Sequence, residues 1–184
     1  IFSSVSDQFN LNGAKAAYHY RNTHSIPANR TVIYLPHNVA MTHEYQALIK
    51  ALAPLGKKLH IMLGIGKDQT RGAYSQEQAI TLIYEKELKA FASHSFHDMS
   101  VPWEMMMAEA VVACSACFNT QIAEKELPCI IYDTRLAPMA RGNKTRINTK
   151  EGLLEIMEDM IRQQQGKTEL ADVLMSMILG GKPK

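Results

Sequence analysis

The chain has 184 residues, of which 46% are hydrophobic and 21% are charged, and its formal net charge is +2. This length predicts one domain with a sizeable core, with or without a short appendage. The small basic excess does not indicate nucleic-acid binding, which usually shows as a concentrated basic surface. No apolar run approaches the ~20 residues that a membrane-spanning helix needs.

The first thirty residues predict a lead-in segment or linker. The chain begins with Ile1 rather than Met, and its first five residues do not resemble a signal peptide. We therefore expect the chain to begin within a longer protein. Residues 14–21 have helical composition, and the segment ends in a predicted turn at residues 27–30.

Five short runs rich in apolar and β-branched residues predict strands. Helical spacing of apolar residues between and after these runs predicts helices. The predicted strands are residues 31–35, 58–65, 95–98, 110–114 and 129–133, and the predicted helices are 42–55, 75–92, 115–125, 149–165 and 168–179. Because the connections are long enough to return parallel, we expect an α/β fold, a Rossmann-like doubly wound parallel sheet with helices on both faces. This domain would span residues 31–166, and residues 167–184 would form a C-terminal helix and tail.

The three cysteines, Cys114, Cys117 and Cys129, lie within one apolar region. Their odd number argues against a disulfide framework and indicates a reducing compartment. The spacing of Cys114 and Cys117 also suits a redox pair or half a zinc site, but no second pair completes such a site. We expect structural cysteines, no metal and no cofactor. The location predicted is cytoplasmic, with association at the inner face of a membrane through other regions left open.

Ligands of open parallel sheets bind at the carboxyl ends of the strands, near the point where the strand order reverses. Pro36 cannot donate a ladder hydrogen bond, so we expect strand pairing to stop there and His37 to project over the carboxyl edge of the sheet. Its imidazole is therefore a candidate general acid or base. The alternative is a loop histidine that bonds to a nearby carbonyl. The second strand ends at Gly64-Ile65-Gly66, which lacks the GxGxxG and P-loop patterns and is equally typical of a tight turn.

The loops after the third and fourth predicted strands also carry candidate residues. Val101 and Trp103 would contact a base, although packing is an alternative for the tryptophan. Ser115, Asn119 and Thr120 lie where the N–H groups of a helix start suit a phosphate. Ordinary capping of that helix by Ser115 is the alternative.

Two stretches resemble the C-terminal half of GT-B-fold transferases, in particular the CDP-glycerol glycerophosphotransferase and capsular-polysaccharide transferase group. The first is Ala17-Tyr18-His19-Tyr20-Arg21, with Ile26-Pro27 before a strand that ends in proline. The second is the helix–strand–helix–strand stretch 104–133. The resemblance implies that Ser115 occupies a hydroxyl position facing the donor, and that Gln121 stands where such enzymes place a ribose-binding Glu. Glu124 lies one turn further on.

The resemblance implies that this chain is the donor-binding half of an enzyme of surface-polysaccharide synthesis. The enzyme would move a glycosyl or polyol-phosphate group from a nucleotide-activated donor, and a missing N-terminal half would bind the acceptor. Helix N-termini with Lys67, Arg71 or Arg135 would hold the diphosphate.

Two other functions remain open. One is an enzyme similar to UDP-sugar 2-epimerases. The other is a non-catalytic Rossmann-like regulatory or interaction domain, which the incomplete phosphate motif and the Cys- and Met-rich interior favour.

Overall fold

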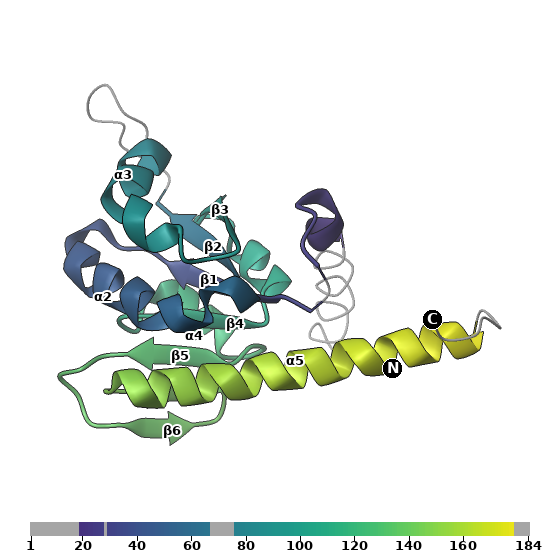
Figure 1. The fold of residues 1–184 in the computed structure, drawn as a ribbon. Helices are drawn as coiled ribbons and strands as arrows, with labels where there is room; N and C mark the ends of the chain where they lie inside the picture. Colours follow the sequence, from purple (N-terminus) through teal and green to yellow (C-terminus); the bar gives the residue numbers. More distant parts are fainter. Residues whose placement is uncertain (1–18, 28, 67–75, 179–184) are drawn as a thin grey trace, which may run out of the picture.

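The computed structural model describes residues 19–27, 29–66 and 76–178. Their centre is a seven-stranded sheet in the order β3-β2-β1-β4-β5-β7-β6 (Figure 1). All neighbouring strands are parallel except β6 and β7. The strands are β1 (Thr31–Pro36), β2 (Leu59–Ile65), β3 (Ser93–Asp98), β4 (Ala110–Ala113), β5 (Cys129–Tyr132), β6 (Met139–Arg141) and β7 (Lys144–Ile147).

Helices cover both faces of the sheet, which confirms the predicted Rossmann-like α/β fold. The α-helices are α2 (Thr42–Leu52), α3 (Gln76–Leu88), α4 (Phe118–Ala123) and α5 (Lys150–Ile178), and the 3₁₀ helices are η1 (Val39–Met41), η2 (Ala53–Lys58) and η3 (Pro102–Met107). Apolar residues of α2, α3 and α5 pack on one face, which we call the first face. Residues of α4, η3 and the segment 19–27 pack on the second face.

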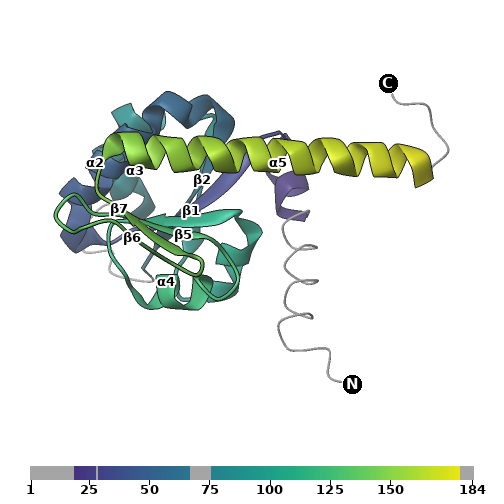
Figure 2. The same ribbon diagram turned by 90° about the horizontal axis from the view of Figure 1, so that it is seen from below.

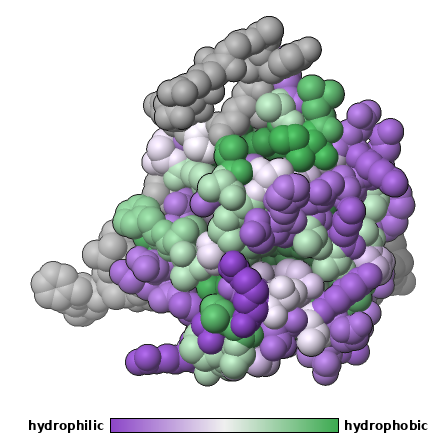
Figure 3. All heavy atoms as spheres, turned by 90° about the vertical axis from the view of Figure 1, so that its left-hand side faces the viewer, coloured by the Kyte–Doolittle hydropathy of each residue, from purple (hydrophilic) through white to green (hydrophobic). Residues whose placement is uncertain are grey.

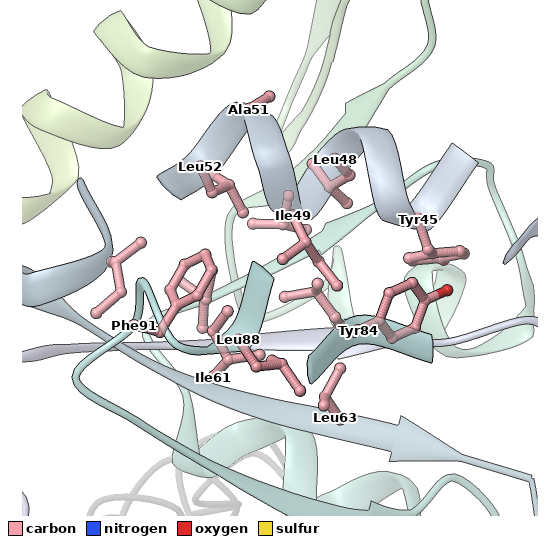
Figure 4. Packing of buried hydrophobic residues seen from close by; sticks show 14 of the residues in the cluster. Tyr45, Leu48, Ile49, Ala51, Leu52, Ile61, Leu63, Tyr84, Leu88 and Phe91 are labelled. Atoms are coloured by element: carbon pink, nitrogen blue, oxygen red, sulfur yellow. The ribbon is translucent and has the colours of Figure 1, made fainter. Parts of the chain in front are cut away.

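The alternation of side chains along β2 explains this division. Leu59, Ile61 and Leu63 point to the first face, where α2 and α3 cover them (Figure 4). His60 and Met62 point to the second face. Full burial of one such leucine or isoleucine stabilises the fold by about 1.5–3 kcal/mol, so the first face supplies a large share of the core energy.

Three segments differ from the prediction. The two helices expected at 149–165 and 168–179 are one continuous helix, α5, which extends past the sheet (Figures 1 and 2). The helix expected at 115–125 is shorter and begins at Phe118. The polar stretch after β5 forms the β6–β7 hairpin, with Gly142 at the turn at φ +59°. Short strands with few apolar residues carry little sequence signal, which explains why this hairpin was not expected.

Within the described parts of the chain, none of the helices has the length and apolar character to cross a bilayer.

Candidate functional site

The strand order reverses between β1 and β4. Figure 3 shows the surface on the side of the molecule toward which the parallel strands of Figure 1 point. Helix α2 follows β1 on the first face, whereas α4 follows β4 on the second face. The loops 37–41 and 114–117 therefore leave the sheet in opposite directions, which is the geometry that creates a ligand crevice. The paired residues of β1 and β4 are few, Ile33 with Ala110 and Tyr34 with Val111.

Ser115 lies where these two loops meet. Its hydroxyl donates to Met41 Sδ at 3.3 Å, a weak contact, and its side chain is partly exposed. Ser115 does not cap α4, because the N-cap of that helix is Cys117. Since a thioether is a weak acceptor, the Ser115 hydroxyl can exchange this contact for a stronger one with a phosphate oxygen.

The other predicted phosphate ligands are already bonded within the protein. Asn119 is buried and its Nδ2 donates to the Met99 carbonyl at 3.2 Å. Thr120 is also buried, and its hydroxyl accepts from the Cys117 N–H and donates to the Cys117 carbonyl, both at 2.8 Å. These two side chains anchor the start of α4, so a ligand would have to displace existing bonds to use them.

Gln121 and Glu124 occupy different surroundings. Gln121 is exposed on α4. Glu124 follows the end of α4, and its carbonyl accepts from Asn143 Nδ2 at 2.9 Å, beside the β6–β7 turn. This turn precedes β7, so Glu124 lies toward the amino edge of the sheet and away from Ser115.

The loop after β3 leads into η3, which carries the predicted base-side residues. Val101 is the N-cap of η3 and is partly buried. Trp103 is 51% exposed, so its ring is open to solvent and available for stacking. The Asn119–Met99 hydrogen bond links this loop to the start of α4. The contact of either residue with a base stays a prediction.

His37 lies in a different environment from the one expected. We expected strand pairing to stop at Pro36 and the imidazole to project over the edge. Strand β1 does end at Pro36. The His37 N–H donates to the Gly64 carbonyl at 2.8 Å, but the side chain points to the first face, where Tyr84 lies. The ring is 3% exposed, and its Nε2 lies 2.7 Å from the Tyr84 hydroxyl. Burial lowers the pKa of His37 to about 4, and its part in proton transfer stays a prediction.

A cavity of about 270 Å³ lies between the start of α2 and the ends of β4 and β5, and it is lined by Cys114, the residue before Ser115. Its lining includes His43, Glu44, Tyr132, Asp133 and Arg135. The Asp133 side chain is 7% exposed and accepts from the Arg135 N–H and Nε at 2.9 and 3.1 Å. These hydrogen bonds lower the pKa of Asp133. The Arg135 side chain is 68% exposed, so its charge can also reach a bound anion.

The sequence singled out only Arg135 in this cavity. Asp133 is the last residue of a predicted strand, which was the available signal, but its nearness to His43 and Glu44 depends on how α2 packs. Lys67 and Arg71, the other predicted cations, lie outside the described residues.

The cysteines are free thiols in a protected setting. Cys114 and Cys129 are buried, and burial raises the pKa of each to about 12. Such thiols are poor nucleophiles at neutral pH. Among the residues the structure describes, no group of three His, Cys, Asp or Glu side chains could hold a metal ion.

Searches of protein-family models, curated proteins and solved structures find no match for this chain.

Proposed function

We propose that this chain is the nucleotide-donor-binding half of a transferase that moves a glycosyl or polyol-phosphate group. The observation that carries the proposal is the strand-order switch between β1 and β4, with the weakly bonded Ser115 hydroxyl at the meeting point of its two loops. The donor phosphates lie against this hydroxyl and the neighbouring N–H groups of residues 115 and 116. A missing N-terminal half binds the acceptor.

The cavity next to the Ser115 loop supports the proposal, because a positively charged side chain stands at it and a diphosphate is negatively charged. The exposed guanidinium of Arg135 stands at the cavity and balances part of the diphosphate charge. Asp133 orients this guanidinium through the Nε contact at 3.1 Å. The exposed ring of Trp103, beyond the start of α4, is the surface on which the base stacks.

A non-catalytic Rossmann-like interaction domain is the second candidate. The observation that favours it is that the Asn119 and Thr120 side chains are already hydrogen-bonded to Met99 and Cys117. Such a domain would bind no nucleotide at this edge, whereas an enzyme similar to UDP-sugar 2-epimerases would bind one.

Isothermal titration calorimetry with CDP, UDP, CMP and GDP tests the proposal. At least one nucleotide should bind, and Ser115→Ala should weaken its binding by about 1 kcal/mol, roughly fivefold, because one hydrogen bond to phosphate is lost. Thr81→Ala is the matched control, since the Thr81 hydroxyl donates to the Glu77 carbonyl within α3, away from the proposed site. Failure of all four nucleotides to bind, or equal affinity in Ser115→Ala, would contradict the proposal.

A further inference from the structure

The second face of the sheet carries a cluster of polar side chains at its β2–β3 end, separate from the carboxyl-edge site. We call it the polar cluster, and its members are Tyr20, His60, Ser93, Ser95, His97 and Glu104. Ser93, Ser95 and His97 alternate along β3 and so share one face. Tyr20 approaches from the segment 19–27 and Glu104 from η3.

Short hydrogen bonds connect the whole cluster. His60 Nδ1 lies 2.6 Å from Ser93 Oγ, and His60 Nε2 lies 2.7 Å from the Tyr20 hydroxyl. The Tyr20 hydroxyl lies 2.5 Å from Ser95 Oγ. Ser95 Oγ in turn lies 2.8 Å from His97 Nε2.

The Glu104 end of the cluster fixes where the protons are. His97 Nδ1 lies 3.1 Å from Glu104 Oε2, and a carboxylate can only accept, so Nδ1 carries the proton. The other nitrogen of His97, Nε2, then has a free lone pair and accepts from Ser95. In the arrangement consistent with this, Tyr20 donates to Ser95 and His60 Nε2 donates to Tyr20. Longer contacts of 3.2 Å also join the Tyr20 hydroxyl to His97 Nε2 and His60 Nε2 to Ser95 Oγ. The Ser95 hydroxyl is thereby polarised toward the imidazole.

We propose that Ser95, His97 and Glu104 form a second reactive site, in which Ser95 is a nucleophile toward small carboxylic esters. The serine–imidazole–carboxylate order and the spacings of 2.8 and 3.1 Å are those that activate a serine hydroxyl. Ser95 is partly exposed and lies on β3, the outer strand of the sheet, and in the proposed reaction a small acyl group approaches Ser95 across this strand.

The reaction has two balanced steps. Ser95 Oγ forms a bond to the ester carbonyl carbon, its proton passes to His97 Nε2, and the C–O bond to the alcohol breaks as that alcohol takes the proton. Water then adds to the acyl-serine and gives a proton to His97. The bond from the acyl carbon to Ser95 Oγ breaks, Ser95 regains its proton, and a carboxylic acid leaves. The Tyr20 hydroxyl, which donates to Ser95 at rest, is placed to donate to the oxyanion.

The surroundings of His97 favour the neutral imidazole that this step needs. Burial lowers the pKa of His97, and the hydrogen bond and charge of Glu104 oppose this shift. The other titratable groups that face His97 are Tyr20 and His24 of the segment 19–27 and His60 of β2. The reaction therefore speeds up as pH rises through the pKa of His97.

A fluorophosphonate probe tests the proposal on the whole chain, because it phosphonylates activated serines. Mass spectrometry should find the label on Ser95, and p-nitrophenyl acetate should be hydrolysed faster than in buffer. Both signals should be lost in Ser95→Ala, and both should fall at least a hundredfold in His97→Gln. Ser100→Ala should keep them, because the Ser100 hydroxyl bonds to Asp98 Oδ1 at 2.7 Å without an intervening imidazole.

Glu104→Gln distinguishes a positioning residue from a structural one. The amide still accepts from His97 Nδ1 but lacks the charge, so the rate should fall about tenfold or more. The midpoint of its pH profile should also shift downward, because the pKa of His97 loses the support of a carboxylate. No label on Ser95 in the native chain, or labelling that persists in a folded His97→Gln variant, would overturn the proposal.

Discussion

Polar side chains at the carboxyl edge and in the polar cluster differ in exposure and in how fully they are hydrogen-bonded. At the edge, Ser115 makes one weak contact and Arg135 is largely exposed. In the polar cluster, His60 is 1% exposed and both of its nitrogens have partners. A group that receives a ligand must keep hydrogen-bonding capacity free, whereas a buried group must use that capacity within the protein. Substitutions at the edge should therefore change binding, and substitution of the buried His60 should change stability.

The largest expected effect is the loss of stability in acid, which comes from the buried histidines. Burial lowers the pKa of His60 to about 3 and that of His37 to about 4, against 6.5 for the free side chain. Because the unfolded chain binds these protons first, stability present above pH 6.5 is lost as pH falls toward these values. The free energy of unfolding should drop by about 2 kcal/mol for each histidine between pH 7 and pH 4.5.

Urea unfolding at both pH values measures this loss. His60→Asn, which cannot titrate, should show a smaller drop than the native chain. His43→Asn is the control, because His43 is exposed at the carboxyl edge. An equal drop in the native chain and in His60→Asn would show that buried His60 does not carry the acid sensitivity.

The next effect in size is the loss of the His60 side chain at neutral pH. His60→Ala leaves a cavity and removes partners from Ser93 and Tyr20, so unfolding should become easier by about 3 kcal/mol. His43→Ala should change the free energy of unfolding by less than about 0.5 kcal/mol. Urea unfolding measures both values. A similar decrease in the free energy of unfolding in the two variants would contradict the difference between cluster and edge.

The smallest effect is expected at Ser115. Ser115→Ala removes only the weak contact with Met41 Sδ, so the free energy of unfolding should change by about 0.5 kcal/mol or less. Thermal unfolding monitored by circular dichroism measures this. A loss of 2 kcal/mol or more would show that the hydroxyl serves the fold, and it would remove Ser115 from the set of groups free to bind a phosphate.

The parallel sheet could be predicted from the sequence because its strands are strongly apolar. The runs 31–35 and 129–133 correspond to β1 and β5, and the intervening helices are long enough for parallel crossovers. The β6–β7 hairpin could not be predicted, because Lys144–Ile147 has three consecutive polar residues and one apolar residue, all of them only partly buried. The break between two helices that was expected after residue 165 is absent, because α5 continues through Gly166.

A residue of the candidate site could be predicted from the sequence only where its place directly after a strand determines where it lies. Ser115 follows β4 and lies at the expected edge. The prediction for His37 was wrong on exposure, because the imidazole packs against Tyr84 on the first face instead of projecting over the edge. The polar cluster could not be predicted, because it joins Tyr20 to a strand 75 residues later. The alternation of Ser93, Ser95 and His97 was its only local signal.

The most direct test of the account is where a nucleotide contacts the chain. Backbone amide spectra recorded by NMR during titration with CDP and with UDP report this residue by residue. The account predicts saturable shifts in the loops 38–41 and 114–117, with smaller shifts at Asp133 and Arg135. In Ser115→Ala the same shifts should need a higher nucleotide concentration, because the nucleotide binds with lower affinity. The absence of shifts with both nucleotides, or shifts confined to the amino edge at residues 124–125 and 142–144, would contradict it.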